Sequence, residues 1–198
     1  SGALTDRPMK TYMKCTESLN LFVLVVNLAL LGNCSGGDLV IGRFGSTNYG
    51  DWKMTGMAFQ SGPVGRAPFA KLGIENASDN QVVSSELQGD GPTGTLTSPE
   101  FKIARNYISF LISGGDFEHD TCVNLVINGV VVKSAVGWRS DRLTPASWDV
   151  RRFKGKKAQV QIVDEASSDW GHINVDHIVQ TDKPERLPVA TGPLYQET

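Results

Sequence analysis

Short runs in which hydrophobic and polar residues alternate occupy most of the chain, and residues typical of turns separate them. The clearest example lies near the C-terminus, where residues 160–163 and 173–179 are rich in Val and Ile and flank a polar bend containing Trp170 and His172. Alternation with a period of two places one set of side chains on each face of a strand. This segment therefore predicts a pair of β-strands joined by a loop that faces a ligand.

The same pattern recurs throughout the chain after residue 38. It predicts strands at 39–44, 53–59, 81–85, 94–98, 107–113, 121–127, 130–135, 147–150, 158–163 and 172–179. Short strands at regular spacing, without a sustained helical period, are typical of an all-β sandwich or barrel. Asn128 and Gly129 separate two of them and predict a tight hairpin, because a type I′ turn needs positive φ at both central residues. The irregular stretch 60–80 is expected to wrap the edge of a sheet.

The two ends of the chain differ from this pattern. Lys10 and Lys14 precede an apolar run at residues 19–31, which predicts a secretory signal peptide, because crossing a bilayer as a helix takes roughly 20 apolar residues. The segment before Cys34 resembles a bacterial lipoprotein signal, so lipidation of Cys34 and plain cleavage both stay open. A secreted, periplasmic or cell-surface location follows, with membrane contact only through such a lipid anchor.

Three segments are therefore expected along the chain. Residues 1–37 comprise upstream residues and the signal peptide, residues 38–182 the β-sandwich module, and residues 183–198 a proline-containing linker toward a missing catalytic domain. Cys122 would be the one cysteine well inside the module, where a small buried hydrophobic side chain is expected rather than a disulfide or a reactive thiol. The formal net charge of −2 and the pI of about 5.9 argue against nucleic acid as a partner.

Motifs for common catalytic sites are absent from the sequence, including a P-loop, a nucleophile elbow and a His-Glu-x-x-His zinc motif. Asp164, Glu165, Asp169 and Asp176 lie close together in sequence, so a pair of catalytic carboxylates is one alternative. Acidic residues in a bend between strands are more often solvated or stabilise the turn. We therefore assign no catalytic residue, and whether the chain is itself an enzyme stays open.

Aromatic residues in polar bends are better candidates for function. Sugars stack their apolar faces on flat rings, and their hydroxyls exchange hydrogen bonds with polar and charged side chains. Trp52 and Trp148 each enter a strand with apolar neighbours and are expected in the core or at a sheet edge. The predicted ligand-binding residues are therefore those of the two polar bends: Trp138, Arg139, Asp169, Trp170 and His172.

Metal ligands are harder to predict from this sequence. His172 and His177 are five residues apart in an expected strand, so they would point to opposite faces and could not share a zinc ion through that strand. Asp176 could join backbone carbonyls of the opening strand in a structural calcium site. No other cofactor is expected.

Four segments together resemble the N-terminal β-sandwich module of secreted bacterial glycoside hydrolases of family 32, which include levanases. They are YGDW (49–52), GTLTSPEF (94–101), YISFLISGG (107–115) and WGHINVD (170–176). The likeness covers about residues 38–182 and implies a jelly-roll β-sandwich of the galactose-binding-like type. The family's Asn-Asp-Pro, Arg-Asp-Pro and Glu-Cys catalytic motifs are not in this chain. Gly45 replaces an acidic residue at the opening strand, which weakens the calcium prediction.

The resemblance implies a non-catalytic accessory or carbohydrate-binding module of a fructan-hydrolysing enzyme. Its partners would be a polysaccharide or oligosaccharide, expected to be fructan, and the catalytic domain of the same polypeptide. Two alternatives stay open: a purely structural domain that supports the catalytic propeller, and a stand-alone lectin-like domain.

Overall fold

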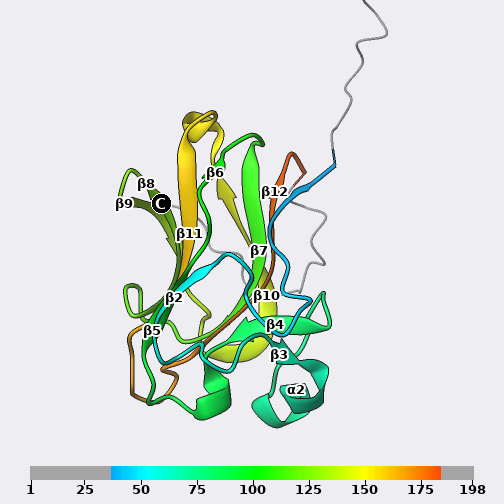
Figure 1. Cartoon of the computed structure of the whole chain (residues 1–198), viewed down its shortest axis with the longest axis vertical. Helices are drawn as coiled ribbons and strands as arrows, with labels where there is room; N and C mark the ends of the chain where they lie inside the picture. The colour runs from blue at the N-terminus through cyan, green and yellow to red at the C-terminus, as the bar shows by residue number, and fades with distance from the viewer. Residues whose placement is uncertain (1–36, 184–198) are drawn as a thin grey trace, which may run out of the picture. The chain divides into compact units, whose positions relative to one another are not determined.

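The structure is a computed structural model of the chain, and it describes residues 37–183 (Figure 1). The predicted signal peptide lies almost wholly outside the described residues, as do Cys34 and nearly all of the predicted linker. A compact unit begins at Gly37. The boundaries predicted from the sequence stay predictions, as does the cellular location.

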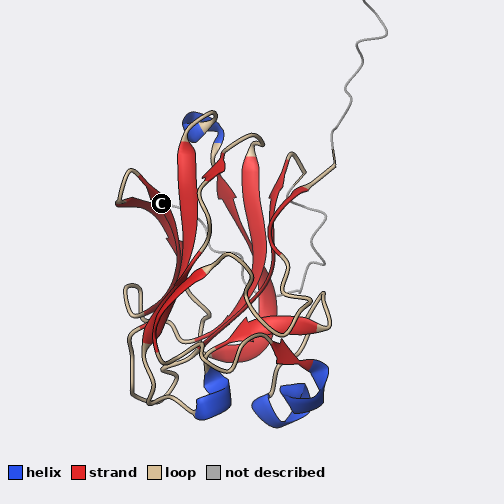
Figure 2. Cartoon of the chain, in the orientation of Figure 1, coloured by secondary structure: helices blue, strands red, loops and turns tan. Residues whose placement is uncertain are grey.

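Two antiparallel sheets pack face to face (Figures 1 and 2). In sheet A the order is β10-β7-β12-β4-β3, with β1 also beside β12; in sheet B it is β2-β5-β11-β8-β9, with β6 also beside β11. Sheet A contains β1 (Leu39–Gly42), β3 (Val64–Gly65), β4 (Gln81–Ser84), β7 (Tyr107–Gly114), β10 (Ser140–Asp149) and β12 (Ile173–Thr181). Sheet B contains β2 (Lys53–Gly56), β5 (Gly94–Thr97), β6 (Phe101–Lys102), β8 (Thr121–Ile127), β9 (Val130–Ala135) and β11 (Lys157–Asp164). The prediction of an all-β jelly-roll sandwich is confirmed.

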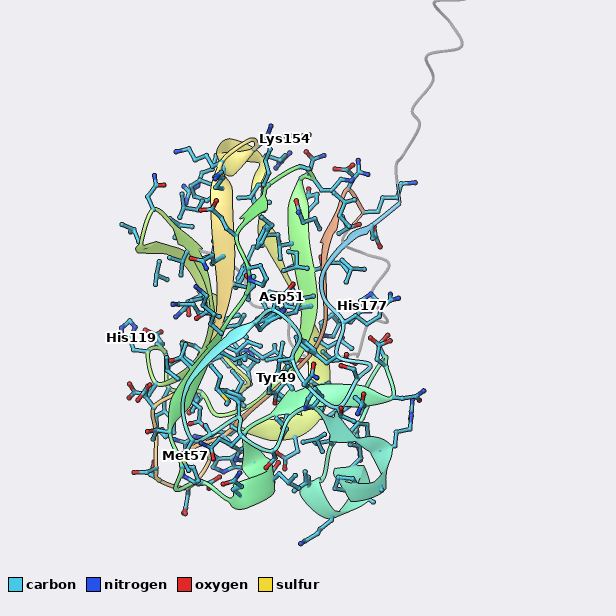
Figure 3. All side chains as sticks on the ribbon, in the orientation of Figure 1. Tyr49, Asp51, Met57, His119, Lys154 and His177 are labelled. Carbon is cyan, nitrogen blue, oxygen red and sulfur yellow. The ribbon has the colours of Figure 1, made fainter. Side chains whose placement is uncertain are left out.

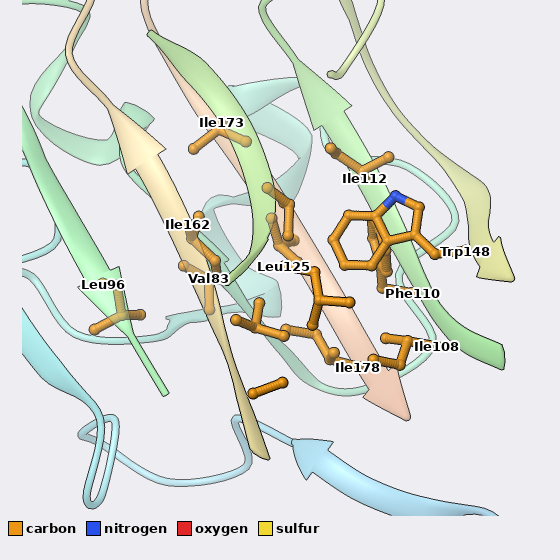
Figure 4. Close-up of a cluster of buried hydrophobic side chains, with 14 of the residues drawn as sticks. Val83, Leu96, Ile108, Phe110, Ile112, Leu125, Trp148, Ile162, Ile173 and Ile178 are labelled. Carbon is orange, nitrogen blue, oxygen red and sulfur yellow. The ribbon is translucent and has the colours of Figure 1, made fainter. Parts of the chain in front are cut away.

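The core fills the space between the sheets (Figure 4). Alternate residues of each strand point into it, as the period of two requires; Phe110 of β7 and Ile162 of β11 are both 0% exposed. Trp148 of β10 packs edge-to-face on Phe110, with ring centroids 4.6 Å apart. Trp52 packs against the edge of the same core, and Cys122 is buried. The structural roles predicted for Trp52, Trp148 and Cys122 are thus confirmed.

The turn at Asn128 and Gly129 is the predicted hairpin. Both residues have positive φ, 52° and 76°, and Ile127 pairs with Val130 across the turn. The local sequence suffices here because a two-residue loop leaves the chain few other ways to reverse direction.

The two strands near the C-terminus, β11 and β12, are a correction to the expected strand pair. They belong to different sheets: β11 pairs with β5, β6 and β8, while β12 pairs with β1, β4 and β7. Residues 165–172 therefore cross from one sheet to the other at the end of the sandwich. Alternation along each strand predicts its buried face but does not identify its neighbour.

The stretch 60–80 contains the short strand β3 and a helix, α2 (Arg66–Leu72), in place of the expected irregular chain. Seven residues are fewer than two full turns, too short for a helical period to be detectable in sequence. The helix ends at Gly73, which adopts φ of 70°. Phe69 and Leu72 pack with Leu111 and Leu143 in a second hydrophobic cluster.

Strand β10 also differs from expectation, since it begins at Ser140 rather than at residue 147. Pro145 lies within it and hid the strand pattern, because proline cannot donate a ladder hydrogen bond; β10 is an edge strand, where this is tolerated. Among the described residues, no helix is long and apolar enough to span a membrane.

Candidate carbohydrate-binding site

Three loops meet at one end of the sandwich, which we call the loop end: residues 115–120 after β7, 136–139 after β9 and 165–172 after β11. Figure 3 shows Met57 at the loop end and Lys154 at the opposite end of the sandwich. Met57 donates its backbone N–H to the carbonyl of Thr93, just before β5. Loops at one end of a sandwich are a common place for binding residues, because rigid strands hold them in place.

Glycine residues let these loops approach closely. Gly115 donates its backbone N–H to the carbonyl of His172 at 2.8 Å, and Gly137 donates to the carbonyl of Gly115 at 2.6 Å. A Cβ atom on Gly137 would collide with the backbone of Ser113 and Gly114. The loop at 115–120 thus contacts both of the others through main-chain hydrogen bonds, and the absence of a Cβ atom at Gly115 and Gly137 permits this close approach.

The backbone is strained at three of the predicted ligand-binding residues. Trp138, Arg139 and Trp170 have φ of 65°, 52° and 66°, in the left-handed region that costs a residue with a Cβ roughly 1–2 kcal/mol. Strain of this kind persists only where the surrounding structure imposes it, and it is concentrated at functional sites. Trp170 shows it next to Gly171, whose Cβ would collide with the carbonyls of Ala166 and Ser168.

The structure places Trp138 and Arg139 on the loop at 136–139, and Asp169, Trp170 and His172 on the loop at 165–172. Arg139 forms an ion pair with Asp116 at 2.9 Å and lies over the ring of Phe117, beside Trp138, which is 57% exposed. Trp170 is half-buried and stacks on His172, with ring centroids 5.6 Å apart. Asp169 is exposed at the tip of its loop. Their role in binding stays a prediction.

His172 lies beneath Trp170 and is held by carboxylates from three other segments. Its Nδ1 is 2.9 Å from Asp90 Oδ1, and its Nε2 is 3.0 Å from Asp141 Oδ1 and 3.9 Å from Glu86 Oε2. Burial opposes the charged imidazolium, but the hydrogen bonds to Asp141 and Asp90 more than offset it and raise the pKa of His172. Burial raises the pKa of Glu86, because it disfavours the charged carboxylate. The result is a polar cluster at the base of the loop end.

Most of this cluster was missed from the sequence. Glu86 lies in a single 3-10 turn after β4, Asp90 in a glycine-rich loop, and Asp141 at the start of β10. None of these segments contains a pattern that points to His172. Only the antiparallel arrangement of β4, β10 and β12 brings their ends to the same place.

The four acids considered as catalytic candidates do not form a pair in one place. Asp164 is 0% exposed and follows the inward-pointing residues Val160 and Ile162 of β11, whereas Asp176 lies in the other sheet, on β12. Glu165 and Asp169 are exposed. Burial between the sheets raises the pKa of Asp164 to about 7.

Asp176, the predicted calcium ligand, is buried on β12 at a bulge where His177 adopts φ of 53°. Its Oδ2 accepts the backbone N–H groups of Ser78 and Asp79 at 2.7 and 3.1 Å. Burial raises the pKa of this carboxyl group, and backbone hydrogen bonds from Asp79, Ser78 and His177 act in the opposite direction. A buried carboxylate suits calcium, but Arg43 lies 3.6 Å from the carboxylate of the neighbouring Asp79 and would compete with a cation there. The calcium site stays a prediction.

No protein-family model matches this chain. The chain is 38% identical over 127 residues to an Aspergillus rugulosus protein named "Putative glycosyl hydrolase ecdE". That match covers 64% of this chain and 18% of the fungal protein. The chain thus spans about a fifth of the length of this relative.

Two solved structures share the fold at low sequence identity. One is the module TmCBM61 in complex with β-1,4-galactotriose, with a TM-score of 0.52 and 12% identity over 74% of this chain and 99% of that one. The other is the K2 cleaved adhesin domain of Lys-gingipain, with a TM-score of 0.50 and 16% identity over 73% and 99%. The chain therefore has a β-sandwich of the kind found in a carbohydrate-binding module, and it is similar in sequence to part of a glycosyl hydrolase.

Proposed function

We propose that this chain is a non-catalytic carbohydrate-binding module of a secreted glycoside hydrolase, and that the loop end binds the sugar. The observation that carries the proposal is that Trp138, Arg139 and Trp170 lie on loops joined by main-chain hydrogen bonds, with a strained backbone at each of these residues. An exposed indole, a guanidinium and carboxylates together offer what a sugar ring needs: an apolar face to stack on, with hydrogen-bond donors and acceptors around it.

Fructan is the ligand we propose, on the basis of the resemblance to the family 32 module. The sequence similarity to a glycosyl hydrolase supports an enzyme as the parent protein, although the match covers 18% of that relative. A catalytic domain in the same polypeptide would then be the partner of this module. The fold shared with TmCBM61, whose structure contains β-1,4-galactotriose, makes galactan the comparison ligand.

Affinity electrophoresis of the full chain through gels containing levan, inulin or β-1,4-galactan tests this function. We expect retardation in the fructan gels, and we expect Trp138→Ala to weaken binding at least tenfold, which corresponds to about 1.4 kcal/mol. Trp138 is 57% exposed, so its loss should leave the fold intact. Phe153→Ala, in the turn between β10 and β11 at the opposite end, is the aromatic control and should bind as the unmodified chain does.

The outcomes separate the candidate ligands and roles. Retardation in galactan alone overturns fructan as the ligand, and retardation that survives Trp138→Ala and Trp170→Ala overturns the loop end as the site. No retardation in any gel overturns carbohydrate binding and leaves a structural role beside a catalytic domain. Side chains exposed at the two edges of sheet B would be the docking candidates in that case: Met54 on β2, and Val130 and Val131 on β9.

A further inference from the structure

Three donor atoms at the base of the loop end lie close enough together to hold one ion. They are His172 Nε2, a carboxylate oxygen of Glu86 and one of Asp141, and all lie within 4.8 Å of one another. Nε2 is 3.0 Å from Asp141 Oδ1 and 3.9 Å from Glu86 Oε2. Ligands about 2.1 Å from a tetrahedral ion are roughly 3.4 Å apart, which lies between these two distances.

The imidazole is already oriented as a metal ligand needs to be. Its Nδ1 faces Asp90 Oδ1 at 2.9 Å, so an Nδ1–H donated to that carboxylate leaves the Nε2 lone pair directed at Glu86 and Asp141. Carboxylates that accept the second N–H of a ligating histidine fix its tautomer and raise its basicity. His172 is buried, and its side chain is 8% exposed, so water competes little for this position.

The charge of the cluster favours a cation. Glu86, Asp90 and Asp141 contribute three negative charges when ionised, and His172 contributes at most one positive charge. The basic residues next to Asp141 in sequence are engaged elsewhere, since Arg139 pairs with Asp116 and Arg142 with Glu75. A divalent ion would offset most of the excess negative charge in this partly buried position.

Asn174 provides an independent indication of a ligand. It is 0% exposed, and its amide oxygen makes no hydrogen bond. It lies in β12, two residues after His172, and a hydrogen bond from its side chain lowers the pKa of Glu86, which places it beside that carboxylate. The hydroxyl of Ser113, which pairs with Asn174 across the sheet, also has no hydrogen-bond partner. Buried polar atoms without partners are costly, so two in one place call for an explanation.

We propose that Glu86, Asp141 and His172 bind a divalent transition-metal ion, with the Asn174 side-chain oxygen as the fourth ligand. Imidazole nitrogen together with carboxylate oxygen suits Zn²⁺ or Mn²⁺ better than Ca²⁺, which prefers oxygen ligands alone. The ion would join the segment after β4, the start of β10 and the residue before β12, next to the imidazole on which Trp170 stacks. The proposal does not rest on sugar binding, and it concerns a different position from Asp176.

Metal binding can be measured on the full, tag-free chain without any sugar. ZnCl₂ and MnCl₂ are titrated separately by calorimetry, with bound metal counted after gel filtration, and the melting temperature is recorded with and without each ion. We expect one ion per chain and a rise in melting temperature, because an ion that binds the folded state alone stabilises it.

Variants test the ligand assignment. Glu86→Gln and His172→Gln should each weaken binding at least tenfold and remove most of the thermal shift. Glu118→Gln and His119→Gln, which change exposed residues of the loop end, are the matched controls and should bind like the unmodified chain.

Asn174→Asp adds a carboxylate to the cluster, so it should lower the melting temperature without metal and enlarge the rise in melting temperature with metal. A larger metal-dependent rise in melting temperature is not expected if Asn174 has only a packing role.

The site is overturned if neither ion binds, or if binding persists in both Glu86→Gln and His172→Gln, as it would at Cys15 or Cys34. It is also overturned if Asn174→Asp shows a smaller metal-dependent shift than the unmodified chain. Tight CaCl₂ binding lost in the same variants would contradict the assignment to a transition metal. Sugar binding by electrophoresis is scored separately, so failure of one proposal does not decide the other.

Discussion

Asp164 shows how a single residue can limit the stability of this sandwich. Its carboxyl group is 0% exposed at the end of β11, and burial raises its pKa from 3.8 to about 7, although hydrogen bonds from the Ser85 side chain and the Ala166 backbone act in the opposite direction. The nearby His172 lowers that pKa, and Asp90 raises it. Such a group binds a proton in the folded state at pH values where the unfolded chain has already released it.

The stability of the protein should therefore depend on pH through Asp164. Between about pH 4 and pH 7 the folded state holds the proton and the unfolded state does not, so this group makes the free energy of unfolding fall as pH rises. Asp164→Asn should remove this contribution and stabilise the protein at pH 8 by about 1–3 kcal/mol. Urea unfolding of both proteins at pH 5 and pH 8 measures this change in the free energy of unfolding.

Asp169→Asn, in an exposed position on the following loop, is the control and should leave the pH dependence unchanged. If Asp164→Asn and the unmodified chain lose stability equally between pH 5 and pH 8, then Asp164 is not the group responsible.

At the scale of elements, prediction from the sequence succeeded for strands and failed where the pattern was short or interrupted. All ten predicted strands have a counterpart, because a half-buried strand must alternate along its own length. The helix α2 and the early start of β10 were missed, since seven residues show no helical period and Pro145 conceals a strand. The sequence placed the loops correctly between strands, but it did not predict which loops contact one another.

The close main-chain contact between two loops at Gly115 and Gly137 gives a prediction at this scale. Gly137→Ala should destabilise the protein by about 1–3 kcal/mol, because the added methyl group meets the backbone of Ser113 and Gly114 and the loops must move apart. It should also weaken retardation in the fructan gel, since Trp138 follows directly. Thermal unfolding and affinity electrophoresis of the same preparation measure both effects.

Gly45→Ala is the matched control, because a Cβ atom at that position has no neighbour within 4 Å and no positive φ is involved. Equal melting temperatures for Gly137→Ala and Gly45→Ala would show that the loops do not depend on this close contact.

At the scale of the whole molecule, the two sheets share one main core, and a second hydrophobic cluster joins α2 to sheet A. Leu111 belongs to the second cluster, while its neighbours Phe110 and Ile112 belong to the first. Strand β7 thus contributes to both clusters, and losing either should disturb the other. The described residues are therefore expected to unfold together.

A chain limited to residues 37–183 should fold by itself and unfold in urea in one transition. Circular dichroism at 218 nm and tryptophan fluorescence should report the same midpoint, because the strands and the buried Trp148 lose their environment together. Two separate midpoints would show that α2 and its cluster unfold independently of the main core.

The sequence by itself determined the class of the fold, most strands, the hairpin at Asn128 and the packing roles of Trp148 and Cys122. These features depend on side-chain alternation and turn chemistry within a few residues, which are local properties. It also identified Trp138 and Trp170 as residues in polar bends. The pairing of strands and the cluster around His172 were decided only by tertiary structure. Glu86, Asp90 and Asp141 come from segments far apart in the chain, and only the antiparallel order of sheet A brings them to one histidine.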